Sequence, residues 1–248
     1  MPLNRQPKHT ILVKDIPVPV HIYVERRPAS RISLGKEKIN IRLSSYLNGQ
    51  QKNETVRSFL VWAQKQISKK QLYRQKEKLI YEEGDTIVIL GEAYTLIFLP
   101  PRGTRATIHI RHDKIIEIRL PEKEMSLEKR QEVITQLLAK GGSTYFLPQV
   151  QTKVHELNKQ YFSKPLGTIR MRYTTSRWGS CSATGNISLS SRLLLAPVWV
   201  MDYVIIHELA HRVEMNHSSR FWRVVAQVMP DYKNAEKWLR KHGANCDY

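Results

Sequence analysis

Cysteine, long apolar runs and acidic residues are all scarce in this sequence of 248 residues. Its two cysteines, Cys181 and Cys246, cannot build the disulfide framework of a small secreted domain. No segment approaches the roughly 20 apolar residues that a membrane-spanning helix needs. Residues 1–14 lack the apolar segment and cleavage site of a signal peptide. We therefore expect a cytoplasmic protein without a membrane partner.

The shortage of acidic residues leaves the chain strongly basic. Lys and Arg number 40 against 22 Asp and Glu, which gives a net charge of +18. Residues 1–78 hold 17 of the basic residues and only five of the acidic ones. Such an excess is typical of a surface that binds a polyanion, here nucleic acid or a nucleotide, and it is equally compatible with a solvated face. Both interpretations of the basic N-terminal half stay open.

Alternating apolar residues indicate that the first part of the chain is rich in strands. Residues 18–24, 32–34 and 39–43 alternate with a period of two, as strands with one buried face do. Residues 52–75 place apolar side chains at helical spacing among many lysines, which predicts a basic amphipathic helix. Further short strands are predicted between residues 86 and 120.

The second part of the chain mixes helices and strands. One helix is predicted from Ser126 to the paired glycines 141 and 142, which are typical of a helix end, and another covers residues 150–161. No internal repeat is apparent. We expect an α+β fold with two domains, a basic strand-rich region with one amphipathic helix over residues 1–122 and a mixed core over residues 123–248.

Residues 207–211 read His-Glu-Leu-Ala-His, and His217 follows. On a helix, residues i and i+4 lie about 40° apart, so His207 and His211 share one face. Their ring nitrogens can both reach a Zn²⁺ ion at about 2.0–2.1 Å. Glu208 stands on the flank of that face, where it can contact a water bound to the ion. We predict a helix from Pro197 to about residue 214.

His217 can join this site only if the chain turns back, because on a continuous helix it would lie about 240° away from His211. Asn216 is a candidate for the break, since Asn tolerates the left-handed conformation of helix ends. Ser218 or Ser219 can then cap the next helix. We expect one zinc ion per chain with three His ligands, and the open fourth position marks a catalytic site.

The expected chemistry is hydrolysis. Zinc lowers the pKa of its bound water toward about 7, and Glu208 takes the proton and returns it to a leaving group. A peptide is the simplest substrate, and a phosphoanhydride such as a nucleotide is the alternative. Two other interpretations stay open: the histidines are hydrogen-bonded core residues, or a structural zinc, with Cys181 or Glu214 as fourth ligand, supports a nucleic-acid-binding module.

Several runs of residues resemble the YgjP-like metal-dependent hydrolases, which are zincins related to the SprT and WLM metallopeptidases. The runs are Arg177-Trp178-Gly179-Ser180-Cys181, Gly185-Asn186-Ile187-Ser188-Leu189, Asp202–His211 and Asn216–Trp222. The resemblance implies a strand-rich amino-terminal part followed by a small zincin-type metallopeptidase core. It also implies that His207, His211 and His217 bind zinc and that Glu208 is the catalytic acid and base.

The resemblance further places residues 177–180 on a strand beside the site. There Arg177 would stabilise an oxyanion and Trp178 would form a wall for the substrate. The alternative is that Trp178 belongs to the core and Arg177 pairs with an acidic residue of the helix. Glu214 stands where the metzincins, with the same ligand spacing, carry Gly. The lysine-rich segment 49–78 is longer than the family requires, and its role is open.

Overall fold

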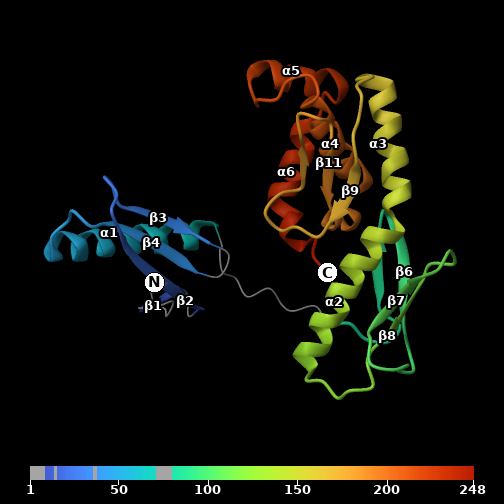
Figure 1. The fold of residues 1–248 in the computed structure, drawn as a ribbon, viewed down its shortest axis with the longest axis horizontal. Helices are drawn as coiled ribbons and strands as arrows, with labels where there is room; N and C mark the ends of the chain where they lie inside the picture. The colour runs from blue at the N-terminus through green and yellow to red at the C-terminus, as the bar shows by residue number, and fades with distance from the viewer. Residues whose placement is uncertain (1–8, 14–15, 36–37, 71–79) are drawn as a thin grey trace. The chain divides into compact units, whose positions relative to one another are not determined.

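The computed structural model describes residues 9–13, 16–35, 38–70 and 80–248. These residues belong to two compact units, Met1–Lys78 and Leu79–Tyr248 (Figure 1). Both units combine strands with helices, so the predicted α+β class is confirmed. Within the described ranges, no helix is long and apolar enough to cross a membrane.

The first unit is a four-stranded sheet followed by one helix. Its elements are β1 (His9–Val13), β2 (Ile16–Glu25), β3 (Arg31–Leu34), β4 (Ile39–Ser44) and α1 (Gly49–Lys70). The strand order is β1-β2-β4-β3, with the central pair parallel and both outer pairs antiparallel. Ala63 and Ile67, one turn apart on α1, share a core with Val20, Ile39 and Ile41 of the sheet. The predicted strands are therefore confirmed, as is the basic amphipathic helix up to Lys70; residues 71–75 of the predicted helix lie outside the described residues.

The second unit begins with the same arrangement. Its first elements are β5 (Thr86–Ile89), β6 (Glu92–Leu99), β7 (Thr107–Ile110), β8 (Ile115–Arg119) and α2 (Leu127–Tyr145). The strand order is β5-β6-β8-β7, again with a parallel central pair and antiparallel outer pairs. The chain therefore contains a structural repeat of four strands and a helix, and the prediction of no internal repeat was wrong.

Matching positions of the two sheets carry matching residues. Residues 39–43 read Ile-Asn-Ile-Arg-Leu and residues 116–120 read Ile-Glu-Ile-Arg-Leu. Ile39 pairs with Val20 across the first sheet, as Ile116 pairs with Leu96 across the second, and all four side chains are fully buried. The two repeats share the alternation of buried and exposed residues that covers one face of each sheet. Few identical residues remain elsewhere, so the repeat is inconspicuous in the sequence.

The remaining elements form a three-stranded sheet with helices around it. They are α3 (Leu147–Tyr161), β9 (Ile169–Arg172), β10 (Gly179–Cys181), β11 (Ile187–Ser190), the 3₁₀ helix η1 (Ser191–Leu195), α4 (Val198–Ala210), α5 (Ser219–Val228), α6 (Tyr232–His242) and the 3₁₀ helix η2 (Gly243–Asn245). The strand order is β10-β11-β9, in which β9 and β11 are parallel and β10 runs antiparallel to β11. The short β10 is thus an edge strand.

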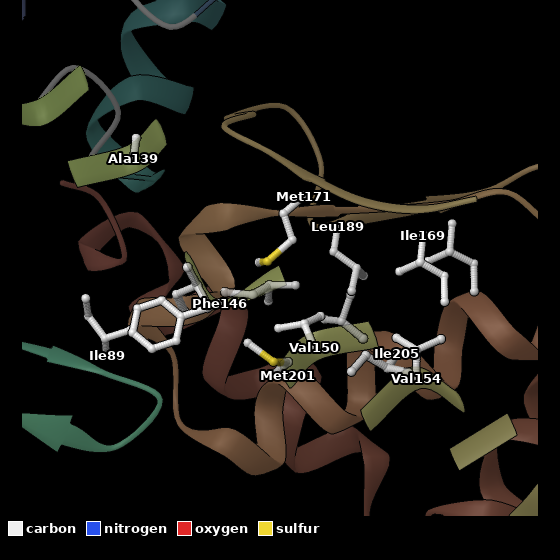
Figure 2. Packing of buried hydrophobic residues seen from close by; sticks show 14 of the residues in the cluster. Ile89, Ala139, Phe146, Val150, Val154, Ile169, Met171, Leu189, Met201 and Ile205 are labelled. Atoms are coloured by element: carbon white, nitrogen blue, oxygen red, sulfur yellow. The ribbon is translucent and has the colours of Figure 1, made fainter. Parts of the chain in front are cut away.

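One large apolar core joins the sheets and helices of the second unit. Ile169 and Leu189 point from β9 and β11 toward Val154 of α3 and Ile205 of α4 (Figure 2). The same cluster includes the buried residues of the β5–β8 sheet. The structure therefore divides the chain between residues 78 and 79, whereas the sequence predicted a boundary at 122/123. The reason for the difference is that the second repeat shares its core with the helices that follow it.

Helix α2 does not end at its paired glycines, as the sequence had indicated, but continues to Tyr145. A Cβ atom at Gly141 would lie 2.7 Å from the side chain of Ile108 on β7. Glycine at this position thus allows the helix to approach the sheet closely rather than terminating it. The predicted start is confirmed, because the Ser126 side chain accepts a hydrogen bond from the backbone N–H of Lys129.

Replacing Leu189 by Ala tests the importance of the shared core. Leu189 is 1% exposed, and truncating such a leucine costs about 2–5 kcal/mol of unfolding free energy because a cavity remains. We expect a loss of this size in urea unfolding monitored by circular dichroism. Leu127→Ala is the matched control, since Leu127 is 58% exposed and should change stability by less than about 0.5 kcal/mol. Equal losses for both variants would contradict the packing described.

Candidate metal centre

The carboxyl end of α4 carries the first two histidines of the candidate site. The helix is apolar on most sides, and Val204, Ile205 and Leu209 are buried in the core. His207 lies in its last turn, and His211 is the first residue beyond it. The imidazole centroids of the two residues are 5.1 Å apart. The predicted shared face of His207 and His211 is therefore present.

The chain breaks after Ala210, not near residue 214 as predicted. The backbone N–H groups of Arg212 and Val213 donate to the carbonyls of Leu209 and Ala210, both at 2.9 Å, so the helix tightens into a 3₁₀ turn. Asn216, the candidate for the break, does not have the positive φ of a left-handed helix end. The return is made by consecutive tight turns in right-handed or extended conformations.

The third histidine follows from this return. Ser218 caps α5, where its side chain accepts a hydrogen bond from the backbone N–H of Phe221. His217 immediately precedes the cap, so the start of α5 sets its position. Its Nε2 atom lies 3.0 Å from Nε2 of His207. One ligand atom from each of the three histidines lies within 4.8 Å of the others.

A buried phenylalanine supports all three rings. Phe221 is fully buried, and its ring centroid lies 4.6–4.9 Å from those of His207, His211 and His217. Trp222 stacks on His217 with centroids 6.0 Å apart. These contacts restrict the orientation of each imidazole before any ligand arrives. Phe221 thus joins the candidate site to the apolar core of the second unit.

The protonation of His207 and His211 suits metal binding. The Nδ1 atom of His211 lies 3.3 Å from the carbonyl oxygen of Glu214. Because a carbonyl only accepts, Nδ1 carries the hydrogen and leaves the Nε2 lone pair free. Burial, followed by the charges of His211 and His217, lowers the pKa of His207 to about 4. His207 is therefore neutral near pH 7, as a ligand must be.

The spacing of the rings fits one ion. Two nitrogens bound to the same tetrahedral zinc at about 2.0–2.1 Å would lie about 3.3 Å apart, close to the 3.0 Å between the Nε2 atoms of His207 and His217. Among the described residues, the group contains the three histidines alone. Neither Cys181 nor Glu214 belongs to it, so the geometry does not favour a closed structural site.

Glu208 is buried directly beside the histidines and against β10. It is 5% exposed, and burial raises the pKa of its carboxyl to about 7, against the opposing charge of Arg177. A Cβ atom at Gly179 would lie 2.5 Å from Oε1 and 2.7 Å from Cγ of Glu208. The backbone of the edge strand thus packs directly on the Glu208 side chain, and only glycine leaves room for it.

Arg177 and Trp178 immediately precede β10, which begins at Gly179, so only part of the segment 177–180 lies on the strand that the resemblance implied. Arg177 is exposed. Trp178 is held between the guanidinium of Arg192, 4.4 Å from its ring centroid, and the backbone of Gly243. The ring packs against the core and also lines a small surface pocket. A substrate-binding role for either residue stays a prediction.

Three converging histidines beside a buried glutamate form a candidate metal centre in the second unit. The family described as YgjP-like, metallopeptidase domain, matches residues 30–242, and the chain belongs to this family. Membership supports a metal-dependent peptidase. It gives no support to nucleotide hydrolysis or to a nucleic-acid partner.

Two solved structures are similar to part of the chain. The metallopeptidase zymogen of Pyrococcus abyssi abylysin is 28% identical over 37% of this chain and 93% of that chain, with a TM-score of 0.34. The metallopeptidase zymogen of Methanocaldococcus jannaschii jannalysin is 17% identical over 37% and 94% of the respective chains, also with a TM-score of 0.34. The search of curated proteins returns no match.

The sequence did not reveal the roles of Gly179, which packs on Glu208, and of Arg192, which contacts the ring of Trp178. Gly179 was visible only as part of a motif, although a glycine inside a strand is itself a signal of close backbone approach. Arg192 had no signal, since its buried guanidinium donates to the carbonyls of Gly243 and Cys246 at the far end of the chain. That pairing depends on tertiary contacts.

The metal content of His217→Ala tests the third ligand. We expect the wild-type protein to hold about one divalent ion per chain, and the variant to retain a small fraction of it, because two histidines alone bind weakly. Mass spectrometry under native conditions measures both. His155→Ala is the control, since His155 is exposed on α3. Undiminished metal in His217→Ala would exclude His217 as a ligand.

Proposed function

We propose that the protein is a zinc-dependent peptidase in which His207, His211 and His217 hold one ion and Glu208 is the catalytic acid and base. The observation that carries this proposal is the convergence of three imidazole nitrogens within 4.8 Å beside a buried carboxyl group. Three imidazoles without a thiolate or carboxylate suit zinc, and they leave a coordination position for catalysis.

Glu208 has the properties that proton transfer requires. Its pKa of about 7 places the carboxylate and the carboxylic acid in comparable amounts near neutral pH, so it can both accept and donate a proton. A zinc ion, when bound, lowers the pKa of water toward about 7 and polarises a carbonyl group. Glu208 then takes the proton of the attacking water and delivers it to the leaving amine nitrogen. Its contact with Gly179 keeps the carboxyl group in place for both steps.

The edge strand β10 provides a place for a peptide. Only one side of β10 pairs with another described strand, namely β11. Its other edge offers backbone N–H and carbonyl groups to an extended chain. Because Gly179 of β10 contacts Glu208, a peptide along this edge passes beside the acid and base. This arrangement favours a peptide over a compact small molecule.

Glu208→Gln separates catalysis from metal binding. Glutamine keeps the size of the side chain but cannot accept the proton, so we expect kcat/KM for a quenched fluorescent peptide mixture to fall by about 10²–10⁴-fold while zinc content is unchanged. Glu156→Gln, on the exposed surface of α3, is the control. Removal of the metal by a chelator should abolish cleavage, and added zinc should restore it. Full activity of Glu208→Gln would refute its assigned role.

Gly179→Ala tests the contact between β10 and Glu208. The new methyl group would overlap the carboxyl group, which must move, and a displacement of about 1 Å costs about 10²-fold in rate. We therefore expect a large loss of kcat/KM with the zinc content retained. Gly49→Ala is the matched control, because a Cβ atom there meets nothing within 4 Å. Wild-type activity of Gly179→Ala would show that the contact does not position Glu208.

A further inference from the structure

Three arginines surround a small pocket on the outer face of the β9–β11 sheet. The pocket has a volume of about 140 Å³ and is lined by Arg170 and Arg172 of β9, by Arg177, and by residues of β10 and β11. None of these arginines is used in the mechanism above as a catalytic group. The cluster therefore needs a separate explanation.

The alternation of β9 places its arginines away from the core. Ile169 and Met171 point into the core toward α3 and α4 (Figure 2), so Arg170 and Arg172 emerge together on the opposite face. Arg170 pairs with Ser188 across the sheet and Arg172 with Ser190. Ser188 in turn pairs with Ser180 of β10. Small serines thus form the floor, and long basic side chains form the rim.

The arginines of the rim have no direct acidic partner among the described residues. Within the described part of the chain, Arg170, Arg172 and Arg177 make no ion pair and donate no side-chain hydrogen bond. Both β9 arginines are exposed. Like charges that line one pocket repel one another, and an anion bound there reduces this repulsion. Guanidinium groups bind carboxylates in a planar, bidentate manner.

The pocket adjoins β10, along whose unpaired edge we propose that the peptide binds. It shares Gly179 and Ser180 of β10, and Gly179 packs on Glu208. Arg177 lines the pocket and stands two residues before Gly179, so it joins the pocket to the strand that packs on Glu208. A group bound in the pocket would therefore belong to a residue close to the bond that is cleaved.

We propose that Arg170, Arg172 and Arg177 form a subsite for a carboxylate of the peptide substrate, so that the enzyme selects peptides with an acidic group near the cleaved bond. The proposal rests on the proposed function and adds its substrate class. The volume of the pocket is several times the roughly 30 Å³ of one water molecule, which is room for a carboxylate and part of its side chain. The carboxylate can belong to a Glu or Asp side chain or to the chain terminus.

Matched peptides measure this selectivity. Pairs with Glu or Gln at one position, moved stepwise along either side of the cleaved bond, detect a side-chain carboxylate, and free-acid against amidated peptides detect the terminal one. We expect wild-type kcat/KM to favour the acidic member by about tenfold or more at one position, as a charge-assisted bidentate contact implies. Arg172→Gln and Arg170→Gln should bring this ratio toward one, and Arg172→Lys should restore part of it.

Arg240→Gln is the charge-matched control, because Arg240 is exposed on α6 and lies outside the pocket. Its ratio should equal that of the wild type, whatever the change in overall positive charge does to both peptides. Equal kcat/KM for acidic and neutral peptides at every position and terminus would overturn the subsite. So would a preference that Arg170→Gln and Arg172→Gln leave intact.

A binding measurement keeps this test separate from the test of catalysis. In the zinc-loaded Glu208→Gln protein, fluorescence anisotropy of labelled peptides should show a Kd about tenfold lower for the Glu peptide than for the Gln peptide, and Arg172→Gln should remove the difference. If this preference appears but no peptide is cleaved by the wild type, the subsite stands and the peptidase proposal fails. If a single-stranded oligonucleotide binds more tightly than any peptide, and Arg172→Gln abolishes its binding, the assignment to peptides is overturned.

Discussion

The contact between Gly179 and Glu208 is the constraint on which the site depends. It joins the edge strand of the β9–β11 sheet to the helix that carries the metal ligands, at a distance that admits no side chain. Because the contact buries the carboxyl group, its pKa rises to about 7, which is the range that proton transfer needs. The same contact brings the arginine pocket on the outer face of the sheet close to the reacting groups. The contact between Gly179 and Glu208 therefore affects the pKa of the Glu208 carboxyl group, its position and its proximity to the arginine pocket.

The remainder of the second unit serves to hold this contact. The Phe221 ring contacts all three histidine rings. Arg192 contacts the ring of Trp178 and donates a hydrogen bond to the carbonyl of Cys246 near the end of the chain. The two copies of the repeat of four strands and a helix bury their apolar residues in different ways. In the first unit the repeat has a core of its own, whereas in the second unit its apolar residues share a core with the helices that carry the histidines. The same pattern of buried residues serves both because alternation only requires that one face be covered.

Local patterns predicted local features well. The His-Glu-Leu-Ala-His run, its helix, the cap at Ser218 and the strands of both repeats follow from spacing within a few residues, and these features are present. Predictions that depended on one residue to break a helix were less successful. Asn216 and the glycines at 141 and 142 are common at helix ends, yet α4 ends earlier through backbone hydrogen bonds and α2 continues because Gly141 is packed against Ile108. Helix propensity alone did not determine where these two helices end; backbone hydrogen bonds and tertiary packing did.

By itself, the sequence determined which side chains could carry the chemistry, since three histidines and a glutamate at this spacing can meet only around a helix end. It also determined the alternating faces of the sheets. The tertiary structure alone decided where the boundary between compact units falls, why residue 179 is glycine and which arginines share a pocket. These features join residues that are far apart in the chain, such as Arg172 with Ser190, or Arg192 with Cys246. Contacts of that kind have no period along the sequence, so they become visible only once the chain is folded.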